Sequence, residues 1–402
     1  MRVLLIDVNC NNGSTGKIVY DLYSNINSRG NTAAICYGRG PKIKEKNIYK
    51  FGIDIETYLH ALLARITGYN GCFSYFSTKR LIKYIDCFKP DIIHIHELHA
   101  YFVNVKTLIK YIKLKKIPVV WTFHCEYMYT GKCGYAYDCE KWKTDCYNCP
   151  LLNDYPRSLF FDRTRKMFNA KKQMLSNFNF TIVTPSKWLA DRVKQSFLKN
   201  KNISIIHNGI DTLNMFYPRN KDETAYLYDK YGIDINKKIV LSVAPNIMDD
   251  RKGGKDILEI AKDMRDYQFV LVGTDKSIKY SNNVIFIKRT NNQDELARLY
   301  SISDLFLICS KKENFPTTCL EAFSCGLPVV GFDEGGTKET VTEPYGEFIK
   351  SGNKKLLKET IENQLSKKFI KKILAEKAIE KYSKENMCNQ YSELYSKLLI
   401  YS

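Results

Sequence analysis

Short apolar runs alternate with amphipathic stretches along this chain, and that pattern limits its possible folds more than any other feature. Runs of Val, Ile and Leu without in–out alternation are typical of strands buried on both faces, as in parallel sheets with crossover helices. Helical spacing surrounds Leu22, Val193 and Ile260. We therefore predict an α/β protein with strands at Val3–Ile6, Ile92–Ile95, Val119–Phe123, Phe180–Val183, Ile203–Ile206, Ile239–Val243, Phe269–Val272, Val284–Ile287, Leu305–Ile308 and Val329–Phe332.

The chain has 402 residues, which is long for a single hydrophobic core, so two domains are expected. A loop rich in Asn, Gly and Pro at 207–220 lies near the first strand of the second domain. We place an N-terminal domain at 1–184 with a cysteine-rich insert at 125–150, a C-terminal domain at 185–380, and a separate amphipathic helix at 381–402.

The charge is strongly basic, with 62 Lys and Arg against 43 Asp and Glu and a formal net charge of +19. Such an excess attracts nucleic acid, anionic lipid or phosphorylated small molecules, or it is simply a lysine-rich surface. No run of eighteen apolar residues is present, and the N-terminus reads as a first strand and not as a signal peptide. We expect a cytoplasmic protein.

The stretch from Ser310 to Glu339 carries the clearest chemistry. Glu313 and Glu321 lie eight positions apart around a predicted helix start, where Pro316 suits the first helical position and Asn314 lies near the cap. Free backbone N–H groups at a helix start favour an anion, and carboxylates accept hydrogen bonds from sugar hydroxyls. A phosphate position beside two such carboxylates fits a nucleotide-sugar.

This arrangement resembles the C-terminal signature of the family 4 glycosyltransferases, which are retaining enzymes of the GT-B fold. The family pattern is E-x7-E, then G-x-P-V, then a glycine pair followed by a glutamate. The resemblance implies two Rossmann-like domains with parallel sheets facing across a cleft, and a C-terminal helix that crosses back onto the N-terminal domain. The residues that carry it are Glu313, Glu321, Gly326, Pro328, Val329, Gly335, Gly336 and Glu339.

The same resemblance implies roles for the glutamates and their neighbours. Glu313 would bind hydroxyls of the donor sugar and Glu321 the ribose. Backbone N–H groups near Asn314, Phe315 and Thr317 would bind the diphosphate.

A glycine loop leads from the first strand into a helix, with Gly13 and Gly16 three positions apart. Glycines there allow a close approach of backbone to a ligand, and a helix start faces it. The loop matches neither a P-loop nor a dinucleotide-binding pattern. It resembles the glycine loop of family 4 enzymes, which implies that Gly13 and Gly16 border the donor phosphates and the acceptor.

His124 ends the predicted strand at Val119–Phe123, and ligands of open α/β sheets bind beyond the carboxyl ends of strands. The alternative is a histidine that bonds only its own loop. The position resembles the family's donor-sugar histidine, which would hydrogen-bond the sugar and stabilise positive charge near the anomeric carbon.

His94, His96 and His99 end another predicted strand and, with Glu97, form either a metal site or part of an acceptor pocket. Because His94 and His96 point to one face of the strand while His99 lies past it, we favour acceptor lining by His96 and His99.

Arg251 and Lys252 precede two glycines after the predicted strand at Ile239–Val243. Paired cations neutralise a departing pyrophosphate without a metal ion. Family members usually have an arginine five residues before the lysine, where this chain has Ile247, so Arg251 is expected to substitute. The alternative is a solvated basic turn.

Four of the thirteen cysteines cluster in the insert with the spacing C-x5-C-x6-C-x2-C. Four thiolates can form a closed tetrahedral zinc site, so we predict that these cysteines bind a structural zinc ion. The alternatives are free thiols and disulfides. Aromatic residues of the same insert are expected to line the acceptor side. The cluster comprises Cys133, Cys139, Cys146 and Cys149.

A basic helical face at Lys106, Lys110 and Lys113 is either a contact with anionic lipid at the inner face of the plasma membrane or a solvated helix surface. Taken together, the features and the family resemblance imply a retaining glycosyltransferase that needs no catalytic cofactor, and the insert resembles that of family 4 enzymes of bacterial surface-polysaccharide pathways. The donor would be a UDP- or GDP-linked sugar and the acceptor a saccharide, expected to be lipid-linked; nucleic acid is not an expected partner. The alternatives are a nucleotide-sugar epimerase of similar fold and a zinc-bearing nucleic-acid-binding protein.

Overall fold

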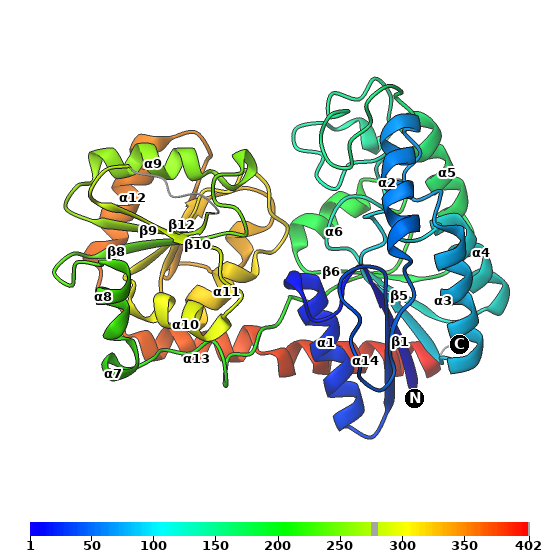
Figure 1. Ribbon diagram of the computed structural model, residues 1–402, viewed down its shortest axis with the longest axis horizontal. Coiled ribbons are helices and arrows are strands. Elements are labelled where there is room, and N and C mark those ends of the chain that lie inside the picture. The colour runs from blue at the N-terminus through cyan, green and yellow to red at the C-terminus, as the bar shows by residue number, and fades with distance from the viewer. Residues whose placement is uncertain (275–279, 401–402) are drawn as a thin grey trace. The chain divides into compact units, whose positions relative to one another are not determined.

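Two compact units make up the protein, and the computed structural model describes residues 1–274 and 280–400 (Figure 1). The first unit contains Met1–His207 and the C-terminal residues from Met387 onward. The second unit is Asn208–Asn386. Each unit contains one parallel sheet, which confirms the predicted α/β class with two Rossmann-like domains.

The first unit has a seven-stranded sheet in the order β3-β2-β1-β4-β5-β6-β7, and every neighbouring pair is parallel. The strands β2 and β3 were not predicted, and β2 contains two alanines that weaken its apolar signal. The strands are β1 (Arg2–Asp7), β2 (Thr32–Tyr37), β3 (Ile48–Lys50), β4 (Ile92–Ile95), β5 (Val119–Thr122), β6 (Thr181–Thr184) and β7 (Ile203–Ile205).

Helices cover both faces of this sheet, so its strands are buried on both sides as their composition predicts. One face packs against α3 to α6, and the other against α1 and α14. The elements are α1 (Gly13–Ser28), α2 (Asp54–Thr67), α3 (Tyr75–Phe88), α4 (Val105–Lys115), η1 (Lys141–Lys143), α5 (Thr164–Ser176), α6 (Lys187–Lys194) and α14 (Lys384–Ile400).

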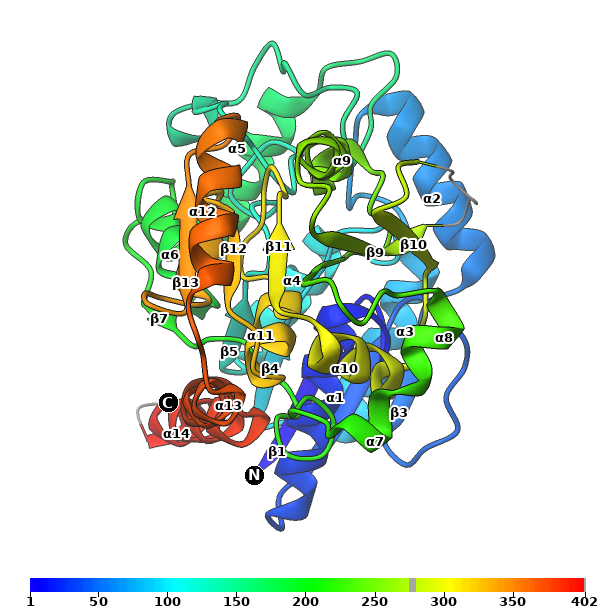
Figure 2. The ribbon, with the colours of Figure 1, turned by 90° about the vertical axis from the view of Figure 1, so that its left-hand side faces the viewer.

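The second unit has a six-stranded sheet in the order β10-β9-β8-β11-β12-β13. The helices α9 and α12 pack on one face and α10, α11 and α13 on the other (Figure 2). Its strands are β8 (Ile239–Val243), β9 (Gln268–Thr274), β10 (Val284–Lys288), β11 (Leu305–Ile308), β12 (Val329–Phe332) and β13 (Gly346–Ile349). Its helices are α7 (Lys221–Thr224), α8 (Tyr226–Tyr231), η2 (Asp250–Lys252), α9 (Gly254–Asp263), α10 (Gln293–Ile302), α11 (Thr317–Ser324), η3 (Thr337–Glu339), α12 (Lys354–Ser366) and α13 (Lys371–Tyr382).

The division between the units differs from the predicted boundary at 184/185 and follows His207 instead. The physical reason is strand pairing, because β7 continues the first sheet, with Ile203 beside Ile182. The second unit likewise extends to Asn386, past the predicted end at residue 380.

The C-terminal helix α14 packs onto the first unit (Figure 1), in the way the resemblance implies. The hydroxyl of Tyr395 lies 2.6 Å from Nδ1 of His94, whose Nε2 lies 2.8 Å from the hydroxyl of Thr122. That hydroxyl lies in turn 2.8 Å from the hydroxyl of Tyr391. Burial lowers the pKa of His94 well below its usual range, so the imidazole is neutral at physiological pH and joins the helix to the sheet by hydrogen bonds.

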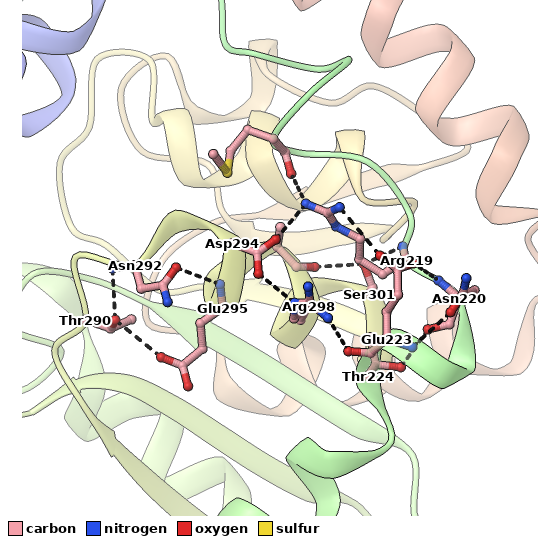
Figure 3. Close-up of polar contacts among 12 residues, drawn as sticks. Arg219, Asn220, Glu223, Thr224, Thr290, Asn292, Asp294, Glu295, Arg298 and Ser301 are labelled. Carbon is pink, nitrogen blue, oxygen red and sulfur yellow. Dashed lines mark hydrogen bonds and ion pairs between the residues drawn. The ribbon is translucent and has the colours of Figure 1, made fainter.

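A polar network ties the segment that opens the second unit to α10 (Figure 3). The guanidinium of Arg219 donates to Asp294, and Arg298 donates both to Asp294 and to the backbone carbonyl of Glu223. Asn220 and Glu223 form a reciprocal capping box at the start of α7. These bonds hold α10 in place, and α10 supplies a tyrosine to the site described below.

We predict that Tyr395→Phe destabilises the first unit by roughly 1–3 kcal/mol, because it leaves a buried nitrogen of His94 without its partner. All three tryptophans of the chain, at 121, 142 and 188, belong to the first unit, so tryptophan fluorescence in urea reports that unit. Tyr58→Phe, at a side chain 70% exposed, is the matched control and should change stability by less than about 0.5 kcal/mol. Equal stability of the two variants would contradict the role given to His94.

Candidate active site

Three neighbouring strands of the second sheet lead into the loops that carry the predicted donor residues. The strands β8, β11 and β12 are adjacent and parallel, so their carboxyl ends lie at one edge. Lys252 follows β8, Glu313 follows β11 and Gly335 follows β12. Strand order therefore brings together residues that lie far apart in the sequence.

Lys252 and Glu313 are in direct contact. The ammonium of Lys252 donates to Oε1 of Glu313, and only 16% and 10% of the two side chains are exposed. The backbone carbonyl of Arg251 accepts a hydrogen bond of 2.8 Å from the N–H of Lys311, which ties the basic turn to the glutamate loop. A solvated basic turn therefore does not describe Lys252, which is an inward-facing cation. Arg251 is half-buried in the same turn.

The glycine pair of the signature lies against the backbone of Glu313. The N–H of Gly336 donates to the carbonyl of Glu313 at 3.1 Å. A Cβ at Gly335 would lie 1.8 Å from the same carbonyl oxygen, and this glycine has a φ of +67°. Only glycine fits both requirements, so the pair allows the loop after β12 to close on Glu313.

The helix α11 begins one residue later than predicted. Thr317 is its first residue and Pro316 occupies the N-cap position, while Asn314 is not its N-cap. Proline still fits, because the N-cap residue has extended backbone and needs no intrahelical N–H bond. Asn314 and Phe315 are buried beside the helix start, and Thr317 is half-buried there.

Glu321 lies one helical turn from the end of α11 and contacts Tyr300 of α10. The tyrosine hydroxyl donates to Oε2 of Glu321 at 3.1 Å. Tyr300 is fully buried, so it fixes the carboxylate from the core side. The sequence prediction did not include Tyr300, because nothing in its local pattern separates it from an ordinary core aromatic.

The first unit repeats this arrangement at the adjacent strands β1, β4 and β5. Asp7 ends β1, His96 and Glu97 follow β4, and His124 follows β5. Asp7 is fully buried, and its Oδ1 accepts a hydrogen bond from the N–H of Glu97 at 3.1 Å. Burial raises the pKa of Asp7 to about 7 despite that bond. Asp7 was not predicted, although an acid at a strand end is the available signal.

His96 and His124 form a pair. Nδ1 of His96 lies 3.0 Å from Nε2 of His124, and the rings are stacked with centroids 5.3 Å apart. Burial lowers the pKa of both imidazoles, so both are neutral at physiological pH. Nε2 of His96 is buried and has no hydrogen-bond partner within the described ranges. Such a nitrogen is a candidate donor or acceptor for a bound hydroxyl.

The three histidines considered for one metal site do not share one. His94 bonds Tyr395, His96 bonds His124, and His99 forms an ion pair of 2.7 Å with Glu97. Although burial opposes it, the Glu97 carboxylate raises the pKa of His99 above its ordinary value. The ligand atoms of Glu97, His99 and Cys125 instead lie within 4.8 Å of one another.

Gly13 and Gly16 have separate structural reasons to be glycine. Gly13 is the first residue of α1 and has a φ of +69°, which disfavours other residues. A Cβ at Gly16 would lie 3.3 Å from the backbone nitrogen of Asn11, whose N–H donates to the carbonyl of Gly16 at 3.0 Å. The pair shapes a tight turn at the carboxyl end of β1.

The predicted insert is a long connection with only the short η1 between β5 and α5. Its aromatic residues Tyr127, Tyr129 and Trp142 are buried in the core of the first unit, whereas Tyr147 is 48% exposed, and the lining of an acceptor site by these residues stays a prediction. Cys133, Cys139, Cys146 and Cys149 line one cavity of about 20 Å³. Among the described residues, ligand atoms within 4.8 Å of one another occur at Glu97, His99 and Cys125 and not at these cysteines. The zinc site stays a prediction.

Comparison with known proteins identifies the family. The model described as Glycosyltransferase Family 4 matches residues 15–213, and the model described as Glycosyl transferases group 1 matches residues 227–385. The chain is 22% identical over 366 residues to the putative colanic acid biosynthesis glycosyl transferase WcaC of Escherichia coli K12, and 87% of each chain is covered. Both findings separate it from the epimerase and nucleic-acid-binding alternatives.

Solved structures show the same fold. Sucrose-phosphate synthase from Thermosynechococcus elongatus superposes with a TM-score of 0.72 at 17% identity over the whole of both chains. Anabaena Alr3699/HepE, solved in complex with UDP-glucose, superposes with a TM-score of 0.68 at 14% identity over 99% of this chain and all of that one. With matched models across both units, this chain belongs to the family 4, group 1 glycosyltransferases and is a glycosyltransferase of the GT-B fold.

Proposed function

We propose that this glycosyltransferase moves a sugar from a nucleotide-sugar to a saccharide hydroxyl and retains the anomeric configuration. The contact between Lys252 and Glu313 carries the proposal, because it sets a cation for phosphate beside a carboxylate for sugar hydroxyls. The structural relative HepE is described in complex with UDP-glucose, which supports the donor class. The similarity to WcaC, a putative colanic acid biosynthesis enzyme, supports a saccharide acceptor in surface-polysaccharide synthesis.

Each donor residue has a part in this scheme. Glu313 accepts hydrogen bonds from the donor sugar hydroxyls, and Glu321, held by Tyr300, accepts those of the ribose. Lys252 and Arg251 balance the diphosphate, so the charge of the leaving group needs no divalent cation. Backbone N–H groups at the start of α11 add donors near Asn314, Phe315 and Thr317.

The first-unit residues are assigned to the sugar and the acceptor. Gly13 and Gly16 provide a tight backbone turn where phosphate approaches, as the family resemblance implies. Neutral His124 hydrogen-bonds the transferred sugar, and its lone pair stabilises positive charge developing at the anomeric carbon. His96 and His99 face the acceptor.

The chemical step breaks the bond between the anomeric carbon and the diphosphate oxygen. The acceptor hydroxyl attacks on the same face and forms the new glycosidic bond. Its proton passes to the departing diphosphate, which carries the electron pair of the broken bond. Configuration is retained because the leaving group and the nucleophile use one face.

Nucleotide binding is the direct test. We expect UDP or GDP at millimolar concentration to raise the melting temperature, since a ligand at a hundred times its Kd adds about 2.7 kcal/mol. Lys252→Met should remove most of this shift, while Lys311→Met, an exposed neighbour, should keep it. If no nucleotide or nucleotide-sugar stabilises the protein, the proposed donor class is wrong. Release of nucleotide without a new glycosidic product would indicate an epimerase or a hydrolase.

Glu313→Gln should lower kcat/KM by roughly a hundredfold, about 2.7 kcal/mol, because the amide is a weaker acceptor for the sugar hydroxyls. Glu362→Gln on the exposed face of α12 is the matched control and should leave turnover unchanged. Circular dichroism establishes that both variants fold. Wild-type turnover by Glu313→Gln would remove this residue from the site.

We also propose that the four cysteines of the insert hold a structural zinc ion. They line one small cavity, and the N–H of Gly131 donates to Sγ of Cys146 at 3.3 Å, the kind of bond that stabilises a thiolate. Lys132 and Lys171 are buried beside them and donate only to backbone carbonyls in the bonds described, so thiolate charge would balance theirs. In this role zinc is scaffold and takes no part in transfer.

Metal analysis of the purified protein should find about one zinc per chain, as a closed site of four thiolates requires. Cys146→Ser with Cys149→Ser should lose it, whereas Cys72→Ser with Cys87→Ser, at exposed free cysteines, should keep it. Two results would contradict the proposal. One is a zinc-free protein in which all thirteen thiols react with an alkylating reagent. The other is a protein mass lower than that of the fully reduced chain by the hydrogens lost in disulfides.

A further inference from the structure

The helix α2 presents large apolar side chains to solvent. Its buried residues are Thr57, His60 and Ala64, which form the inner face. On the outside, Ile55 is 80% exposed and Leu59 and Leu62 are each 53% exposed. A helix on a globular domain normally has the reverse arrangement, with apolar residues inward.

The exposed residues share one helical face. Positions 55, 58, 59, 62 and 66 follow the i, i+3, i+4, i+7, i+11 spacing, so their side chains form a continuous stripe along α2. In Figure 1 the helix α2 is drawn above the strands of the first unit's sheet, and no described element is drawn over it.

Two other segments extend the stripe at both ends of α2. At the N-terminal end, the Glu56 carboxylate accepts a hydrogen bond of 2.7 Å from the N–H of Phe76, which holds exposed Phe76 against α2. At the C-terminal end, the N–H of Leu159 donates to the carbonyl of Arg65 at 2.8 Å. The apolar strip so formed comprises Ile55, Tyr58, Leu59, Leu62, Ile66, Tyr75, Phe76, Leu159, Phe160 and Phe161, all exposed.

Cations lie along the edges of the apolar strip. The guanidinium of Arg163 lies 5.2 Å from the centroid of the Phe161 ring, and the ammonium of Lys79 lies 4.7 Å from that of Tyr75. Arg65 is exposed in the last turn of α2. Of the acids nearby, Asp54 pairs with Lys50, while Glu56 and Asp162 accept hydrogen bonds from backbone N–H groups and keep their negative charge. Arg65, Lys79 and Arg163 outnumber these two carboxylates, so the edge is net positive, in a chain with a net charge of +19.

We propose that the apolar strip binds the surface of an anionic lipid bilayer and holds the enzyme where a lipid-linked acceptor is found. Apolar side chains enter the boundary between headgroups and acyl chains, while the flanking cations meet anionic headgroups. A protein partner or a second copy would not require this positive edge. No helix within residues 1–274 and 280–400 is long and apolar enough to cross a membrane, so the contact lies in the plane of the interface.

The basic face of α4, for which the sequence pattern left lipid contact and a solvated surface as alternatives, is a weaker candidate. Leu108, Ile109 and Ile112 are fully buried in the core, so the lysines of α4 offer charge with a single exposed leucine, Leu114, beside them. Charge without insertion gives weak, salt-sensitive adsorption. We therefore assign the lipid-binding surface to α2 and not to α4.

Co-sedimentation of the full chain with vesicles tests this without any substrate. The probes are vesicles of phosphatidylcholine alone and vesicles of phosphatidylcholine mixed with phosphatidylglycerol. We expect binding to the mixed vesicles and little to phosphatidylcholine alone, since anionic lipid supplies part of the attraction. Leu59→Gln with Leu62→Gln should lower the bound-to-free ratio by roughly tenfold or more, because two side chains no longer enter the bilayer.

The matched control is Leu213→Gln with Ile235→Gln, which changes two exposed apolar residues of the second unit. It should bind vesicles as the wild type does, and circular dichroism establishes that both variants fold. A protein that binds neither kind of vesicle would overturn the proposal. Equal vesicle binding by the two double variants would overturn it as well. A dimer in light scattering that only Leu59→Gln with Leu62→Gln dissociates would assign the strip to self-association instead.

The proposal rests on the proposed transfer of a sugar to a saccharide acceptor, which we expect from the sequence to be lipid-linked, but the two fail separately. Vesicle binding needs neither nucleotide nor turnover, so a protein that binds vesicles and no nucleotide would refute only the transferase mechanism. A protein that binds nucleotide and no vesicle would refute only the apolar strip.

Discussion

The direction of the strands is the constraint on which the rest of this structure depends. All neighbouring strands in both sheets are parallel, so every loop that follows a strand emerges at the same edge of its sheet. In the second unit the adjacent strands β8, β11 and β12 place Lys252, Glu313 and Gly335 together. In the first unit the adjacent strands β1, β4 and β5 likewise place Asp7, His96, Glu97 and His124 close together.

Burial then gives these groups their chemistry. The ion pair between Lys252 and Glu313 lies mostly out of water, where charges interact strongly. The His96–His124 pair is neutral for the same reason, because burial disfavours the imidazolium. A neutral imidazole can still accept or donate a hydrogen bond.

Sequence patterns located several residues that the structure brings together in the second unit, because the requirements of these positions are local. Gly335 needs a positive φ and no Cβ beside the carbonyl of Glu313, and only glycine meets both needs, so the position stands out in the sequence pattern.

Tyr300 and Asp7 were missed because their importance comes from partners that are distant in sequence, Glu321 and the N–H of Glu97. The same limit misplaced the domain boundary, since only pairing with β6 shows that β7 belongs to the first sheet.

By itself the sequence determined the parallel α/β class, the presence of two domains, and the signature of glutamates and glycines. Tertiary structure alone decided which way each amphipathic face points. Periodicity shows that apolar residues share one side of a helix, but it does not show whether that side contacts a sheet or water. The helices α4 and α2 show the difference, because α4 packs Leu108, Ile109 and Ile112 into the core while α2 keeps Leu59 and Leu62 exposed. The reason is physical: Thr57, His60 and Ala64 already complete the inner face of α2, so its leucines remain on the side that faces solvent.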